Sequence, residues 1–203
     1  MGKRIGITCV FLGVVCILSA VGFIVCNRWE DNRAASLSQG LLENVQSMID
    51  DPLPDDKTLP PDPTQKIPAE MATVEVDGYD CIGILSVPVL ELELPVLTPW
   101  SYAKLKKAPC LYYGTYYEKD FVISAHNYRS HFGRLSELQA GDLVTFTSVN
   151  GQVYYYEVAL LETLPPTATE AMITSGFDLS LYTCTPGGGN RVTLRCNAKN
   201  ITN

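Results

Sequence analysis

The sixteen residues LYTCTPGGGNRVTLRC (Leu181–Cys196) decide the fold of the chain's C-terminal part. Two runs typical of β-strands flank a glycine-rich turn, which predicts an antiparallel hairpin. If Thr185–Asn190 forms the loop, Cys184 lies directly opposite Arg191, and all apolar pairs fall on one face of the hairpin. These pairs are Leu181 with Leu194 and Leu179 with Cys196. A slip of one residue would mix the two faces, so the pattern specifies the register.

This register has a chemical consequence. It places the Cβ atoms of Cys184 and Arg191 about 5 Å apart, and a nearby cation favours the reactive thiolate of a cysteine. Arg195 lies four residues further along, about 13 Å away, so Arg191 is the better partner. A nucleophilic cysteine also needs a group that protonates the leaving amine. The chain has only two histidines. His126 ends a predicted strand and His131 follows in a polar loop, so His126 is the candidate.

The same residues also fit a non-catalytic interpretation. Cys184 can be a buried structural cysteine and His126 a surface residue at a strand end. A cell-wall peptidase or L,D-transpeptidase is a further alternative, but such enzymes carry histidine and cysteine close together in one motif. Here the two residues are 58 positions apart, which argues against that class.

From Thr73 onward the sequence consists of short strand-like runs separated by turn residues. DLVTFTSV and QVYYYEVALLETL flank Asn150–Gly151, a dipeptide that favours a two-stranded hairpin. Two short helices are expected, in Ser130–Leu138 and in Thr167–Gly176, where Thr167 and Glu170 match a capping box. Many short strands and few helices predict a mostly β protein, either a barrel or a sandwich.

The N-terminal part has a different composition. Residues 5–26 form an uncharged segment that is long enough to be a transmembrane anchor. A cleaved signal peptide is the alternative. We expect residues 1–4 to be a cytoplasmic stub, and 27–72 to be a stalk helix, or one packed on the main domain, followed by a Pro/Asp-rich spacer. Residues 73–203 form the predicted β domain. Positive charges flank the apolar run almost evenly, so charge alone decides its orientation only weakly.

Composition also limits the partners. The formal net charge of -7 gives no electrostatic reason to expect nucleic-acid binding. The two histidines and seven cysteines show no metal-ligand spacing, so we predict no structural zinc site, and no cofactor motif is found.

Two segments together resemble the sortase family, the cysteine transpeptidases on the surface of Gram-positive bacteria. They are ISAHNYRSHFGRLSEL (Ile123–Leu138) and LSLYTCTPGGGNRVTLRC (Leu179–Cys196), and GILSVPVLELELPV and PCLYYGT resemble early strands of the same family. The resemblance covers about Tyr79–Cys196. It implies an eight-stranded sortase-type β-barrel with short helices, preceded by the transmembrane helix, and an extracytoplasmic catalytic domain on a single-pass membrane protein.

The resemblance also implies site residues and partners. The catalytic residues would be His126, Cys184 and Arg191. The enzyme would cleave an LPxTG-like sorting signal of a secreted protein through a cysteine thioester and transfer it to an amine of a peptidoglycan precursor or a pilin. Substrate-binding candidates are residues beside the motifs and in the loop before the cysteine strand: Asn127, Thr183, Ala168, Met172 and Ile173. The last three either line a substrate groove or pack a helix on the barrel.

Two departures from the family pattern concern the site. Ala125 stands where many members have glycine, and the loop between cysteine and arginine is shorter than in many members. The absence of a second apolar segment favours a B-like or D-like subclass. The alternative function is a membrane-anchored extracellular β-domain that binds a surface partner without catalysis.

Overall fold

The computed structural model describes residues 2–50 and 71–199. The chain divides into two compact units, Met1–Arg33 and Ala34–Asn203. The Pro/Asp-rich part of the predicted spacer falls within residues 51–70 and lies outside the described residues.

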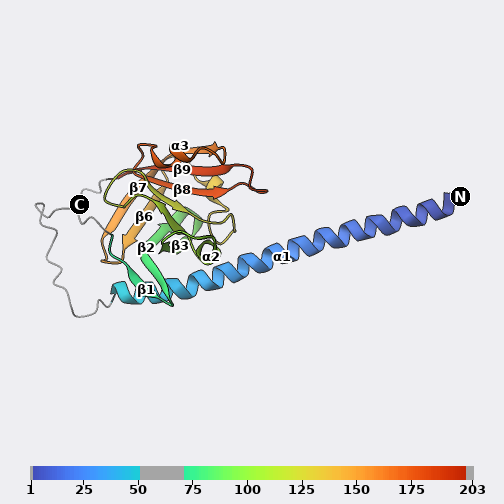
Figure 1. Cartoon of the computed structure of the whole chain (residues 1–203), viewed down its shortest axis with the longest axis horizontal. Helices are drawn as coiled ribbons and strands as arrows, with labels where there is room; N and C mark the ends of the chain where they lie inside the picture. The colour runs from blue at the N-terminus through green and yellow to red at the C-terminus, as the bar shows by residue number, and fades with distance from the viewer. Residues whose placement is uncertain (1, 51–70, 200–203) are drawn as a thin grey trace, which may run out of the picture. The chain divides into compact units, whose positions relative to one another are not determined.

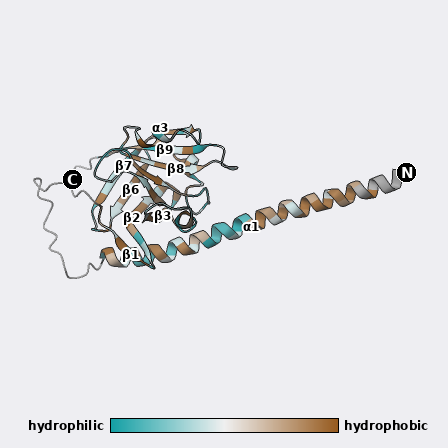
Figure 2. Ribbon diagram, viewed as in Figure 1, coloured by the Kyte–Doolittle hydropathy of each residue, from teal (hydrophilic) through white to brown (hydrophobic). Residues whose placement is uncertain are grey.

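The first unit is part of one long helix, α1 (Gly2–Asp50). Its large apolar side chains from Ile7 to Val25 are all exposed, and Figure 2 colours most of the ribbon in this stretch as hydrophobic. By length and composition the helix is able to cross a membrane. Because α1 continues without a break to Asp50, the predicted anchor and the predicted stalk helix belong to a single helix.

The second unit contains a closed β-barrel (Figure 1). Eight strands follow the order β2-β3-β4-β5-β8-β9-β7-β6, and β6 pairs with β2 to close the sheet. Their bounds are β2 (Tyr79–Val87), β3 (Leu92–Thr98), β4 (Cys110–Tyr113), β5 (Phe121–Ser124), β6 (Leu143–Ser148), β7 (Val153–Leu164), β8 (Leu179–Cys184) and β9 (Arg191–Ala198). A ninth short strand, β1 (Val74–Val76), extends the sheet beside β2. The predicted eight-stranded barrel is therefore confirmed.

Short helical segments connect the strands: the 3₁₀-helices η1 (Pro88–Leu90) and η2 (Leu135–Glu137), and the helices α2 (Tyr102–Leu105) and α3 (Thr169–Ile173). The predicted hairpin around Asn150–Gly151 is confirmed by the antiparallel pairing of β6 and β7. Gly151 has a φ of +79°, a backbone conformation that glycine adopts without strain.

The barrel interior is filled by inward-facing residues from all sides of the sheet. Phe121 and Phe146 pack edge to face with ring centroids 5.2 Å apart, and Tyr116 packs against Phe146 at the same distance. Leu179, Leu181, Leu194 and Cys196 belong to the same buried cluster. The inward residues of β8 and β9 are thus those that the hairpin pattern assigned to one apolar face.

A second apolar cluster lies on the outside of the barrel, under α1. Leu41 and Val45 of α1 are buried there against β1, β2 and β3, with Cys81 and Leu97 among their neighbours. Leu37 lies on the same helix and is exposed. Residues 34–50 therefore pack on the barrel, the second of the two roles that the sequence left open for this helix.

The short helical segment expected within Ser130–Leu138 is present as the 3₁₀-helix η2. One local prediction was wrong. The capping box at Thr167 does not form, because α3 begins after Ala168 and its N-cap makes no side-chain hydrogen bond. The two prolines before Thr167 explain the shift: Ala168 N–H donates to the Pro165 carbonyl at 3.1 Å, so Thr167 lies inside a turn instead of at the helix start.

Candidate active site

The ends of β5 and β8 bring His126 and Cys184 to the same level of the sheet. The two strands run parallel, with Phe121 paired with Leu179 and Ser124 with Tyr182. Continuing this register by two residues places His126 beside Cys184. The Ala125 N–H donates to the Tyr182 carbonyl at 3.2 Å, so the pairing extends past the last assigned residue of β5. Residues that are 58 positions apart in the sequence thus become neighbours.

The β8–β9 hairpin places Arg191 opposite Cys184. The observed register pairs Cys184 with Arg191, Thr183 with Val192, and Leu181 with Leu194. The register predicted from the sequence is therefore confirmed. Cross-strand partners have Cβ atoms about 4.5–5.5 Å apart and project from the same face, so the guanidinium and the thiol belong to one surface.

The loop between these strands is held by its own hydrogen bonds. Thr185 N–H donates to the Asn190 carbonyl at 2.9 Å, and Gly188 N–H donates to the Thr185 carbonyl at 2.8 Å. Gly187 and Gly188 both have positive φ, +83° and +75°. Arg191 Nη1 donates to the carbonyls of Gly188 and Asn190, each at 3.1 Å. The loop therefore also orients the Arg191 side chain.

Alternation along β8 assigns Cys184 to the outer face of the barrel. Leu179 and Leu181 point into the core, so the alternate residues Ser180, Tyr182 and Cys184 face outward. We call these three residues the outer strip. Cys184 is half-buried, so part of this residue is exposed at the barrel surface.

Thr183 points in the opposite direction. Its side chain is 3 % exposed, and its Oγ1 donates to the Ala125 carbonyl at 2.9 Å. The hydroxyl is therefore committed to the segment that leads into His126. This hydrogen bond links β8 to the residue that follows β5.

The other predicted binding residues lie on two segments. Asn127 is exposed, directly after His126. Ala168 precedes α3, while Met172 and Ile173 belong to it, and Met172 is 4 % exposed. Met172 thus packs the helix on the barrel, whereas Ala168 and Ile173 are half-buried at its border. His131 is fully buried, and its ring and that of half-buried His126 both pack on Tyr128, with centroids 5.5 and 5.0 Å from the tyrosine ring.

From the sequence, Arg195 was only a rival to Arg191 as the partner of Cys184, and the structure gives it a different environment. Arg195 is 1 % exposed. Its guanidinium binds Glu162 Oε1 at 2.8 Å, Ser180 Oγ at 2.8 Å, and the carbonyls of Ala171 and Met172 at 2.7 and 3.3 Å. These acceptors occupy the guanidinium of Arg195, whereas Arg191 is the arginine paired with Cys184 across the hairpin.

Aromatic side chains continue from the outer strip across β4 toward α2. Tyr182 packs edge to face on Tyr112 at 5.2 Å, and Tyr112 on Trp100 at 6.2 Å. Trp100 Nε1 donates to Ser124 Oγ at 2.9 Å, which anchors the row to β5. Burial raises the pKa of Tyr182, while Arg191 acts in the opposite direction. The aromatic surface therefore begins directly beside the Cys184–Arg191 pair.

The remaining cysteines of the barrel are buried thiols. Burial raises the pKa of Cys81, Cys110 and Cys196 to about 12 each. None of the cysteines in the described part of the chain forms a disulfide. Cys184 alone among these four reaches the surface, which fits a reactive role for this thiol.

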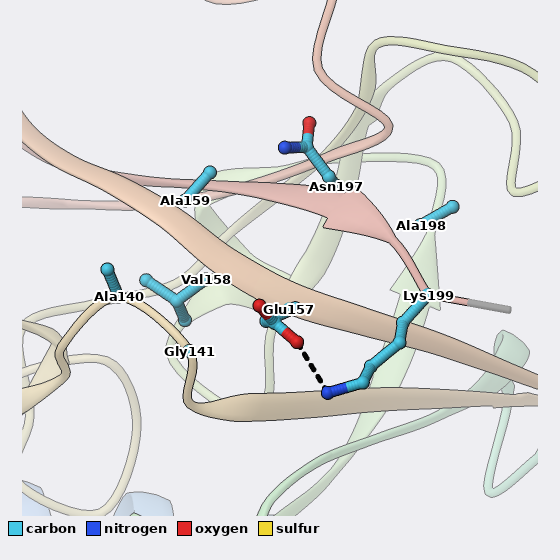
Figure 3. A pocket seen from close by; sticks show the side chains of 8 residues that line it. All are labelled: Ala140, Gly141, Glu157, Val158, Ala159, Asn197, Ala198 and Lys199. Atoms are coloured by element: carbon cyan, nitrogen blue, oxygen red, sulfur yellow. Dashed lines mark hydrogen bonds and ion pairs between the residues drawn. The ribbon is translucent and has the colours of Figure 1, made fainter. Parts of the chain in front are cut away.

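A surface pocket lies at the opposite end of β9 from Arg191 (Figure 3). Small residues and the Glu157–Lys199 ion pair line it. Asn197 is six residues beyond Arg191, which corresponds to about 20 Å along a strand. The pocket contains none of the candidate catalytic residues, so it is separate from the outer strip.

The barrel is similar to known proteins. A family model described as the sortase domain matches residues 85–199. A search of the curated proteins finds no match. Among solved structures, a Clostridium perfringens sortase D5 transpeptidase is similar, with 17% identity, a TM-score of 0.60, and coverage of 81% of this chain and 99% of that one.

Two further structures show the same fold. Streptococcus pneumoniae sortase C has 23% identity and a TM-score of 0.53, covering 85% of this chain and 90% of that chain. Sortase A from Corynebacterium diphtheriae has 20% identity and a TM-score of 0.55, covering 61% of this chain. The match spans 63% of that sortase A chain, slightly under two thirds of its length.

Proposed function

The chain belongs to the sortase family, and on this basis we propose that it is a membrane-anchored cysteine transpeptidase whose nucleophile is Cys184. The observation that supports the proposal is that the end of β5, the end of β8 and the start of β9 lie side by side. The parallel β5–β8 register and the antiparallel β8–β9 register bring His126 and Arg191 to either side of Cys184.

The proposed reaction has two acyl-transfer steps. The Cys184 thiolate attacks the carbonyl carbon of the scissile bond in an LPxTG-like sorting signal, and a thioester forms as the C–N bond breaks. His126 gives a proton to the departing amine. Arg191 donates hydrogen bonds to the carbonyl oxygen as negative charge develops on it. An incoming amine then attacks the thioester, its proton passes to His126, and the C–S bond breaks to release the Cys184 thiolate.

The proposed partners follow from the family. The acyl donor is a secreted protein with a C-terminal sorting signal, and the acceptor is an amine of a peptidoglycan precursor or of a pilin. The S. pneumoniae sortase C is described by its pilin substrate specificity, which supports including pilins. A membrane anchor at residues 5–26, with the barrel outside the cell, brings the enzyme to such substrates.

Peptide cleavage tests this proposal. The full chain in detergent is mixed with a panel of fluorogenic peptides that vary each position of the sorting signal, with and without an amine acceptor. We expect one peptide class to be cleaved, with His126→Ala and Arg191→Ala each at least about 100-fold slower. Absence of cleavage for every peptide would instead favour a non-catalytic surface-binding domain.

A further inference from the structure

The segment between β7 and β8, residues 165–178, is held against the barrel by two side chains from outside it. Arg195 reaches it from β9, and Asp120 reaches it from the residue before β5. We propose that Arg195 and Asp120 are positioning residues that keep this segment, including α3, as a preformed border of the outer strip. The inference rests on the proposed function, because it assigns the border to the same substrate site.

Arg195 holds the C-terminal end of α3. The last carbonyls of a helix have no partner within the helix, and here those of Ala171 and Met172 accept from Arg195. The same guanidinium binds Glu162 of β7 and Ser180 of β8. One fully buried cation therefore joins α3 to three strands. Figure 1 shows α3 lying along β9.

Asp120 holds the turn that follows α3. Its Oδ1 accepts from the Ser175 N–H at 2.7 Å, the Ser175 hydroxyl at 2.8 Å and the Gly176 N–H at 2.9 Å. The backbone adds two bonds, since Asp120 N–H donates to the Phe177 carbonyl at 2.8 Å and Phe121 N–H to the Asp178 carbonyl at 3.3 Å. The turn is thereby fixed directly to the start of β5.

The segment held by Arg195 and Asp120 lies at one end of the outer strip, and Cys184 lies at the other. Ser180, which Arg195 binds, is the far end of the outer strip, and Cys184 is the near end. Four residues of a strand separate them by about 13 Å, and Ser180 is fully buried, so the strip is covered at its far end. A peptide that reaches Cys184 over Tyr182 therefore ends at α3. If α3 moved, peptide binding would weaken, although the thiol itself would be unchanged.

Matched variants of the full chain in detergent test the proposal. Arg195→Lys keeps the charge but loses the fork that binds several acceptors. Asp120→Gly removes the carboxylate while tolerating the φ of +61° at this position. Asp120→Asn keeps one carboxamide oxygen as acceptor and also tolerates this φ, so it is the conservative control.

Three readouts are compared: KM and kcat for peptide cleavage, the rate at which iodoacetamide alkylates Cys184, and proteolysis within 165–178. For Arg195→Lys and Asp120→Gly we expect KM to rise at least about 10-fold and proteolysis to accelerate similarly. Alkylation should stay within about 2-fold, and Asp120→Asn should remain near wild type in all three.

Unchanged KM in these two variants would overturn the proposal, as would a loss of alkylation parallel to the loss of cleavage, which indicates general damage to the barrel. Failure of the proposed function looks different, because the wild type itself would then cleave no peptide. In that case unchanged proteolysis in the two variants would still refute the role of Arg195 and Asp120 in holding the segment.

Discussion

Cys184 shares the barrel with three other thiols but differs from them in environment. Cys81, Cys110 and Cys196 are buried, with pKa values raised to about 12, whereas Cys184 is half-buried on the outer face. A thiol with a pKa near 12 is less than about 1% thiolate at pH 9, and only the thiolate reacts with alkylating agents. Alkylating agents should therefore react faster with Cys184 than with the other three cysteines.

We predict that iodoacetamide at pH 8 modifies Cys184 in the native chain at least about 50-fold faster than Cys81, Cys110 or Cys196. Peptide mass spectrometry after timed alkylation measures each rate. The same experiment in urea is the control, because unfolding should make the four rates similar. Equal native rates would contradict the burial assigned to the three thiols.

The buried thiols also predict a loss of stability in alkaline solution. Their folded pKa values lie above the ordinary value near 9, so between about pH 9 and 12 the folded state binds more protons than the unfolded state. The free energy of unfolding must then fall as pH rises, by at most about 1.4 kcal/mol per pH unit for each thiol. Urea unfolding at pH 8, 9, 10 and 11 measures this slope, and a flat profile would contradict it.

Sequence alone predicted the three candidate catalytic residues, because each lies at the end of a recognisable strand. It did not predict what Thr183, Asp120 and Arg195 do. Their partners are Ala125, Ser175 and Ala171, which lie between 24 and 58 positions away. Such contacts arise from the way the barrel closes, and no local pattern of the chain encodes them visibly.

At the scale of elements, the β8–β9 hairpin was the most predictable part of the molecule. Its alternating apolar pairs allow only one register, and the observed pairing agrees with it. The start of α3 was mispredicted because a local capping motif competed with the turn formed by Pro165 and Pro166. Sequence patterns thus predicted the strands whose apolar residues are buried in the core. The capping motif gave a wrong prediction in a loop whose residues are mostly exposed.

The hairpin loop gives a matched test of backbone strain. Gly188 has a φ of +75°, a conformation that disfavours a side chain, while Gly189 has no such φ and open space around it. We expect Gly188→Ala to lower the free energy of unfolding by about 1 kcal/mol and to slow peptide cleavage, because Arg191 binds the Gly188 carbonyl. Gly189→Ala should leave both near wild type. Equal effects of the two substitutions would contradict the loop conformation.

The C-terminal part of α1 provides a second test at this scale. Leu41 is buried against the barrel and Leu37, one turn away, is exposed. Leu41→Ala should lower the free energy of unfolding by about 2–4 kcal/mol, and Leu37→Ala by less than about 1 kcal/mol. Urea unfolding of the full chain in detergent measures both. Similar costs for the two variants would show that this face of α1 does not pack on the barrel.

At the scale of the whole molecule, the apolar helix predicts membrane attachment. We expect the full chain to remain in the membrane fraction after an alkaline carbonate wash. Replacing Leu12 and Leu18 by arginine costs about 3 kcal/mol each at the centre of a spanning helix and should release much of the protein. Leu12→Ile with Leu18→Ile is the control that keeps the helix apolar. Release of the wild-type chain by carbonate would contradict the anchor.

The barrel and its family were predictable because eight amphipathic or buried strands and two motifs occur in a fixed order. The continuity of α1 from Gly2 to Asp50 was not predictable in this way, since the sequence changes from apolar to polar within the helix without a proline to mark an end. A change in composition therefore marked a change of environment here, and not an end of secondary structure.

The most direct test of the account is the covalent intermediate itself. The full chain in detergent is incubated with a cleavable sorting-signal peptide without an amine acceptor, quenched with acid, and analysed by intact and peptide mass spectrometry. We predict an added acyl mass on Cys184 alone, absent in Cys184→Ala and lost on treatment with hydroxylamine. Peptide cleavage without any acyl adduct on Cys184, or an adduct that persists in Cys184→Ala, would contradict it.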